Sequence, residues 1–358
     1  MSPRRWESAG WFFGFLGFAA ASVGWILAPG AFAYAWLIML IAWLGWPLGC
    51  MGLLLIHALT GGRWGNAIRP QLLAGARTVL LLPPLLIPYV FAAPRLYPWL
   101  GEEHAIHLAN TLYLNGPAFI LRGVGYLAVW CGLEVIIARR VHGENPEQSL
   151  ARVAPAGLIA LAITITFASI DAVMSLDPRF ASSVFGLVAI AEMGLFALAV
   201  CILAAVISGE ARQERLRELG RLLLALTILW AYLDFMQLLI IWQSDLPREA
   251  SWYVLRWSGG WGYVAALIAG GHFVAPFFIL LSSKAQRSAG AMACACALLI
   301  LGALLQSFWL VAPAAVANLH AVVAIVAAAV IGVGGFSIAQ AVRPPPAIGH
   351  LTARRRHV

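Results

Sequence analysis

Residues 184–207 read VFGLVAIAEMGLFALAVCILAAVI, an apolar run in which Glu192 is the single charged residue. About 20 apolar residues in a helix are enough to cross the hydrocarbon core of a bilayer. Nine more stretches of this kind lie along the chain, and 62% of its 358 residues are hydrophobic while 11% are charged. A soluble domain has about 25% charged residues. The composition therefore predicts an all-α polytopic membrane protein.

We predict one integral membrane domain over residues 1–358, with ten transmembrane helices and no separate soluble domain. The third span contains Pro83, Pro84 and Pro88, which remove backbone donors from its hydrogen-bond ladder. We expect neighbouring helices to satisfy the carbonyls that this frees. The predicted spans are 11–28, 33–59, 72–91, 117–137, 155–174, 184–207, 222–242, 261–281, 291–310 and 321–339.

The distribution of basic residues predicts the orientation. With ten spans, 18 of the 23 Lys and Arg residues fall on one side of the membrane. Basic loops are retained on the cytoplasmic side, so we expect both termini in the cytoplasm. The net charge of +8 is then a topology signal. No basic stretch interleaved with aromatic residues suggests a nucleic-acid partner.

Aromatic residues gather at the predicted span ends on the other side, for example Tyr97 with Trp99 and Trp252 with Tyr253. We interpret them as a belt at the membrane surface. The alternative is a platform on which a quinone stacks.

Ionisable residues inside the spans are the candidate functional groups, because charge in hydrocarbon is costly and is usually kept for a purpose. By the predicted topology, His57 and Glu134 lie in the cytoplasmic half of the bilayer, and the others lie near its middle or in the outer half. This layout is expected of two half-channels for protons. Glu192 has no residue on its own helix with which to pair. The candidates for a proton path are His57, Glu134, Asp171, Glu192, Asp234 and His272.

Helical spacing groups some of these residues with polar neighbours. Arg122 and Tyr126 fall on one stripe of the fourth span, and Asp234 and Gln237 share a face of the seventh. We interpret Arg122, Tyr126 and Gln237 as quinol contacts or as packing residues. The alternative for the whole set is internal pairing that fixes the helices, for instance Arg122 with Asp171.

His272 lies one turn before Pro276 and directly after Gly270 and Gly271. Because proline has no N–H, the carbonyl of His272 loses its helical donor. A loosened helix at this point suits a water chain or a quinone head group. An ordinary proline kink is the alternative.

The five cysteines all fall in apolar stretches, without a CxxCH or CxxC motif. We therefore predict no covalently bound haem, no iron–sulfur cluster and no metal site, and we expect all five to be buried packing residues.

Several stretches together resemble one family. They are HALTGGRWG at 57–65, YLN at 113–115 with Arg122, FASID at 167–171, MSLDP at 174–178, WAY at 230–232 and HFVAPF at 272–277. These stretches are similar to those of the ActF-type membrane subunits of bacterial alternative complex III, a quinol:cytochrome c oxidoreductase, which are related to the NrfD/PsrC-type subunits. The resemblance covers about residues 30 to 290. The chain departs from the family at Ala172 and at Arg179-Phe180, where tryptophan and His-Trp or His-Phe are usual.

The resemblance implies two NrfD-like four-helix bundles plus two peripheral helices in the bacterial inner membrane. It implies quinone or quinol as the small molecule, with haem and iron–sulfur clusters in partner subunits. The implied partners are a second NrfD-like subunit, a periplasmic iron–sulfur subunit, cytochrome c subunits, a terminal oxidase and lipids. It also implies proton half-channel roles for His57, Asp171 and His272.

Three functions remain open from the sequence. The first is a subunit that is not catalytic alone and that lines a proton path coupled to quinol oxidation elsewhere in its complex. The second is a structural anchor without a proton or quinol role. The third is a secondary transporter, although such folds usually contain two matching halves and no internal repeat is apparent.

Overall fold

The computed structural model describes residues 3–100, 112–143, 145–209, 213–244, 246–315 and 317–342. Over these residues the chain is helical, and ten helices are long and apolar enough to cross a membrane. The prediction of an all-α polytopic membrane protein is therefore confirmed. The α-helices are α1 (Pro3–Leu27), α2 (Pro29–Thr60), α3 (Arg63–Arg77), α4 (Leu82–Leu96), α5 (Gly116–Val141), α6 (Pro146–Ala172), α7 (Phe185–Ile207), α8 (Gln213–Ser244), α9 (Pro247–Trp257), α10 (Trp261–Ile268), α11 (Ala275–Leu281), α12 (Ala289–Val311) and α13 (Leu319–Val342).

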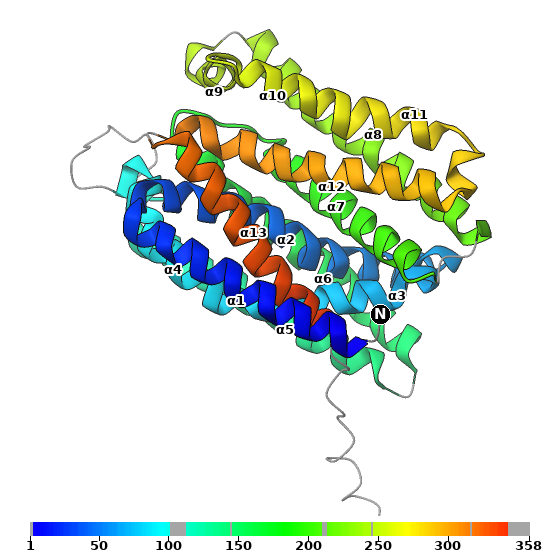
Figure 1. The fold of residues 1–358 in the computed structure, drawn as a ribbon. Coiled ribbons are helices and arrows are strands. Elements are labelled where there is room, and N and C mark those ends of the chain that lie inside the picture. The colour runs from blue at the N-terminus through cyan, green and yellow to red at the C-terminus, as the bar shows by residue number, and fades with distance from the viewer. Residues whose placement is uncertain are drawn as a thin grey trace, which may run out of the picture.

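The spanning helices form two four-helix bundles and a peripheral pair (Figure 1). The first bundle contains α2, α5, α6 and the span that α3 and α4 form together. The second contains α7, α8, α12 and the span that α10 and α11 form together. The bundles meet mainly where α2 packs against α7, while α1 lies along α13 and α13 packs on α2. The short helix α9 lies beyond the ends of α8 and α10 (Figure 1).

The peripheral pair approaches closely because glycines face each other. A Cβ atom at Gly17 of α1 would collide with the backbone of Gly332 on α13, and one at Gly335 would collide with Gly14. Small residues at such crossings let membrane helices pack backbone against backbone.

The proline-rich third span is longer than predicted and is built from two helices. It runs from Arg63 to Leu96, and a 3₁₀ segment at Thr78–Leu81 joins α3 to α4. Pro83 and Pro84 fall in the first turn of α4, where a missing N–H leaves no bond unmade. The start of this span cannot be recognised from hydropathy, because α3 contains several polar residues. The turn before it is tight, and its Gly61 and Gly62 have φ of 67° and 97°.

Two predictions about exposure are wrong. Tyr97, Trp99 and Trp252 are not a lipid-facing belt, because at most 9% of each residue is exposed. They pack inside the protein, where the Tyr97 hydroxyl bonds the carbonyl of Ala172. Cys294 is exposed on α12 instead of buried.

We call the end of the molecule that carries the Gly61–Gly62 turn and the α11–α12 turn the basic end. The end that carries α9 is the opposite end (Figure 1).

Candidate functional site in a cavity between the two helix bundles

A cavity of about 460 Å³ lies between the bundles and reaches both of them. Most of its wall is apolar, from α2, α4, α5 and α6 on one side and α7, α8 and α12 on the other. Its polar lining residues come from several different helices. They are Tyr89, Tyr126, Trp130, Ser169, Asp171, Glu192, Trp230, Asp234, Gln237, Gln306 and Ser307.

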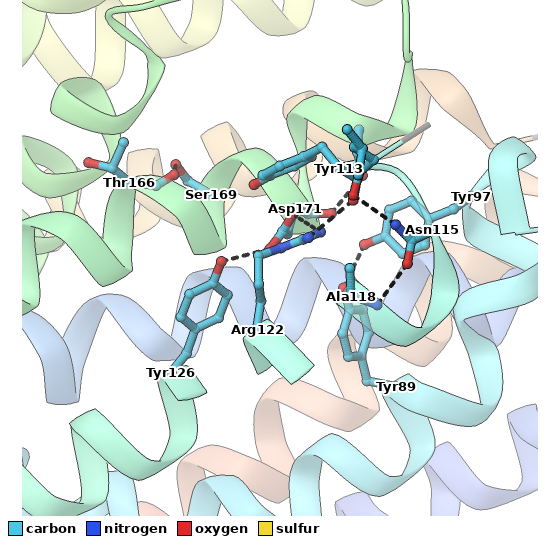
Figure 2. Close-up of polar contacts among 12 residues, drawn as sticks. Tyr89, Tyr97, Tyr113, Asn115, Ala118, Arg122, Tyr126, Thr166, Ser169 and Asp171 are labelled. Atoms are coloured by element: carbon cyan, nitrogen blue, oxygen red, sulfur yellow. Dashed lines mark hydrogen bonds and ion pairs between the residues drawn. The ribbon is translucent and has the colours of Figure 1, made fainter. Parts of the chain in front are cut away.

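Asp171 lies at one side of this cavity in a closed ion pair (Figure 2). Its two carboxylate oxygens accept from Nε and Nη2 of Arg122, at 2.9 Å each, and Tyr126 donates to it at 2.7 Å. The guanidinium lies 3.9 Å from the ring centre of Tyr113. The carboxylate side chain is 5% exposed and the guanidinium 20%. This two-pronged, hydrogen-bonded geometry is the strong form of a charged pair.

The local sequence positions this pair. Asn115 caps α5 by accepting from the N–H of Ala118, and Pro117 fills the first turn. One turn further on, Arg122 faces the last turn of α6, where Asp171 is found. Burial, and then the Asp171 carboxylate, raise the pKa of Tyr113, so its ring stays neutral beneath the guanidinium. The pairing considered as an alternative from the sequence is therefore present.

Glu192 meets His272 on the second-bundle side of the cavity. Glu192 Oε2 lies 3.2 Å from His272 Nε2, and the Trp230 ring stands edge-on to the imidazole with the ring centres 4.3 Å apart. Neither Glu192 Oε1 nor His272 Nδ1 has a partner among the described residues. Sequence reasoning identifies both residues but not their pairing, because they lie on separate helices.

The helix that carries His272 changes its winding at this point. Residues Ala269–Val274 form a π-helix, and the N–H of Ala275 bonds the carbonyl of Gly270 five residues back. Pro276, without an N–H, follows directly, so the loosened helix expected from the sequence is observed in place of a simple kink. A Cβ atom at Gly302 of α12 would collide with the His272 ring. The π segment and Gly302 together therefore fix the imidazole against Glu192.

Asp234 and Gln237 line the cavity from α8. Gln237 accepts from Ser182 at 2.9 Å and donates to the Tyr253 hydroxyl at 3.1 Å, so both ends of its amide are engaged. Asp234 forms no hydrogen bond or ion pair within the described parts of the chain. Asp234 and Gln237 thus share one face of α8, as predicted. Gln237 is hydrogen-bonded there, whereas Asp234 is not, within the described residues.

Compared with models of protein families, this sequence matches none. A comparison with curated proteins also finds no match. The resemblance to the ActF type therefore rests on the short motifs alone, and it stays a prediction.

The remaining two proton-path candidates lie away from the cavity. His57 lines a second cavity of about 140 Å³ at the basic end, and its Nε2 lies 2.9 Å from the carbonyl of Gly62. Glu134 is buried on α5, and its Oε2 has no partner among the described residues. It lines neither cavity, and the two cavities share no lining residue. The structure thus unites Asp171, Glu192 and Asp234 and leaves His57 and Glu134 apart.

Three buried polar residues, two of which line the cavity, are not among the candidates from the sequence. Gln306 on α12 is 4% exposed and lines the cavity. Trp130 donates to Thr164 at 2.9 Å and lines it as well. Arg256 on α9 is 1% exposed. A buried glutamine or arginine in an apolar stretch is a usable signal, whereas the partner of a tryptophan N–H cannot be read from one sequence.

The chemistry that this arrangement supports is proton or cation handling. Carboxylates and amides face one low-dielectric space, and an imidazole contacts one of the carboxylates from behind the wall. A bound water or ion there would replace partners that the described residues do not supply. Among the described residues, no group of three His, Cys, Asp or Glu side chains is placed to hold a metal ion.

Proposed function

We propose that this chain is a membrane subunit of a quinol:cytochrome c oxidoreductase of the alternative complex III type. In this role it lines a proton path coupled to quinol oxidation in the complex. It is not catalytic alone, and its partners carry the haem and iron–sulfur centres. The motif resemblance supports the identity of the complex.

One observation supports the proton role above the others. Asp171, Glu192 and Asp234 line one cavity, and Glu192 Oε1 and the Trp230 indole N–H beside it have no hydrogen-bond partner among the described residues. Buried polar groups are almost always hydrogen-bonded, so unpartnered ones beside a cavity that other polar side chains line are consistent with bound water. Water between these carboxylates is the medium that a proton relay needs, and His272 contacts one of them.

The orientation is part of the same proposal. The basic end faces the cytoplasm of a bacterium, since the basic residues concentrate there. Asp171, near the opposite end of α6, is then close to the periplasmic side. His57 and its small cavity lie at the cytoplasmic end.

The test begins with the native complex. An affinity-tagged chain is purified from its own membranes, and quinol:cytochrome c activity is measured in the preparation. We expect this activity to co-purify with a second multispan subunit. A preparation without it would contradict the assignment to this complex.

The proton path is tested on the same complex in vesicles. Glu192→Gln and Asp234→Asn are introduced singly, and protons released per electron are counted. Each is expected to lower the ratio while electron transfer continues. Glu249→Gln, on α9 away from the cavity, is the matched control. An unchanged ratio in both cavity variants, with the complex intact, would reject the proton path.

A structural anchor is the second candidate, and one observation favours it for part of the site. Both oxygens of Asp171 are engaged by Arg122, and Tyr126 adds a third bond. A carboxylate held in this way joins α5 to α6. Asp171→Asn is then expected to reduce assembly of the complex without changing the proton ratio of the complexes that do assemble.

A further inference from the structure

The cavity between the bundles carries acids but no basic lining residue. Asp171, Glu192 and Asp234 are among its lining residues, and no Lys, Arg or His of the described chain is. Arg122, behind Asp171, neutralises that carboxylate, while His272 contacts only one oxygen of Glu192. A carboxylate in apolar surroundings requires a proton or a positive partner. The described residues provide none at hydrogen-bonding distance for Asp234.

Two further side chains indicate that something binds beside these acids. Gln306 lines the cavity, is 4% exposed and forms no hydrogen bond within the described residues. Trp230 lines it too, and its buried indole N–H has no partner there. Asp234 lies within electrostatic range of both Glu192 and His272. Glu192 and Asp234 thus place two acidic side chains near each other in the cavity wall.

The rest of the cavity suits a bulky apolar body. Its volume of about 460 Å³ lies within the roughly 300–1,000 Å³ of drug-sized ligand pockets. Aromatic rings of Phe119, Tyr126, Trp130 and Phe196 line it. Aromatic faces attract organic cations, most strongly where water is excluded.

The cavity also reaches the outer surface of the first bundle. Its lining includes Val90 and Phe91 on α4 and Ile120 and Val124 on α5, which are 48%, 66%, 56% and 58% exposed. These four apolar residues belong to membrane-spanning helices. A hydrophobic molecule dissolved in the bilayer therefore has a side entrance between α4 and α5.

We propose that this cavity binds a hydrophobic organic cation. Its positive charge lies between Glu192 and Asp234, and its apolar body lies against the aromatic wall. This inference goes beyond the proposed respiratory role and does not depend on it.

The test uses the full chain in lipid nanodiscs with tetraphenylphosphonium, a permanent hydrophobic cation, followed by equilibrium dialysis at fixed pH. Triphenylphosphine oxide, neutral and of related shape, is the matched probe, and empty nanodiscs give the background. We expect saturable binding of one cation per chain. The neutral probe is expected to bind at least about tenfold more weakly, since a desolvated charge pair contributes strongly to recognition.

Variants locate the site. Asp234→Asn and Glu192→Gln are each expected to weaken cation binding by about tenfold or more. Asp234→Glu keeps the charge and should keep most of the affinity, which separates lost charge from misfolding. Glu134→Gln removes a buried acid that does not line the cavity, and we expect no change.

Three results would overturn the inference: no saturable cation binding, equal binding of the neutral probe, or full binding in both charge-removing variants. Binding is measured without quinol or electron acceptor. A failure of the cation-binding test can therefore be distinguished from a failure of the proton-release test.

Discussion

Glu192 and His272 lie 80 residues apart in the sequence and meet with 3.2 Å between Oε2 and Nε2. One is about two turns into α7, and the other lies in the π segment between α10 and α11. π-helical turns are rare and often mark functional positions. This contact links a winding defect in one helix to an acid on another, beside the cavity between the bundles.

Gly302→Ala tests how firmly that contact is held. The added methyl group would collide with the His272 ring, so the imidazole must move or the helices must separate. We expect destabilisation of about 1–3 kcal/mol, as for other overpacked cores. Thermal unfolding followed by tryptophan fluorescence measures it.

Gly194→Ala is the matched control for this change. A Cβ atom there has no neighbour within 4 Å. The substitution should therefore be neutral or stabilising by about 0.5–1 kcal/mol, the usual gain of alanine over glycine in a helix. Equal effects of the two substitutions would show that His272 is not fixed by Gly302.

Asp171→Asn is expected to cost about 3 kcal/mol of unfolding free energy. Breaking one side of a buried ion pair leaves an uncompensated charge, here the guanidinium of Arg122. The double variant Arg122→Gln with Asp171→Asn should recover part of the loss. A coupling energy near zero in this double-mutant cycle would contradict the ion pair.

Gly49→Ala tests the contact between the bundles. A methyl group at Gly49 would collide with the backbone carbonyl of Met193 on α7, which cannot swing away like a side chain. Gly52, three residues later on α2, is the control, because a Cβ atom at that position would meet nothing within 4 Å. We expect Gly49→Ala to lower the unfolding temperature and Gly52→Ala to leave it unchanged or higher. Equal unfolding temperatures would show that α2 and α7 pack less closely.

Features that depend on the local sequence can be predicted from it, whereas features that depend on packing between helices cannot. Hydropathy alone gives the ten helices, because spanning a bilayer is a local property of each stretch. It misplaces the start of the third span, since Arg63, Arg69 and Arg77 interrupt the hydropathy although the helix continues. Buried aromatic residues such as Trp252 resemble lipid-facing ones, because a sequence does not show which helix covers them.

The site is predictable residue by residue but not as an arrangement. Charge in an apolar stretch identifies Asp171, Glu192, Asp234 and His272. Which acid meets which base depends on helix packing across the two bundles. Glu192 has no partner on its own helix, and the sequence does not reveal that another helix supplies one. Arg256 counts as a surface charge in the topology argument, whereas it lies buried inside the protein.

Arg256 is expected to attach α9 to the second bundle. Its Nη2 donates to the carbonyl of Leu310 near the end of α12 at 2.5 Å, and the guanidinium stacks on Trp252. Arg256→Leu leaves that carbonyl unpaired, at a cost of about 1–3 kcal/mol. We expect faster proteolysis within α9. Arg248→Leu, at an exposed position of the same helix, is the control and should not change the cleavage rate.

The contribution of Arg256 should not vary between pH 6 and 8. Burial lowers the pKa of Arg256 from its ordinary value to about 9, so both the folded and the unfolded chain hold the proton throughout this range. Above about pH 9 the folded state releases its proton before the unfolded state does. The unfolded state then binds more protons, and the stability of the native protein relative to Arg256→Leu rises with pH. If the difference in unfolding free energy between the native protein and Arg256→Leu changed between pH 6 and 8, another group would have to titrate with Arg256.

Cysteine labelling tests the proposed orientation. Ser258, beyond α9 at the opposite end, and Ser283, in the α11–α12 turn at the basic end, are both exposed. Each is changed to cysteine in a chain whose five native cysteines are replaced, so that no basic residue is lost. In intact cells, a membrane-impermeant maleimide should label Ser258→Cys and should reach Ser283→Cys only after the membrane is opened. The reverse pattern would place the basic end outside the cytoplasm, and the assignment of His57 to the cytoplasmic end would then be wrong.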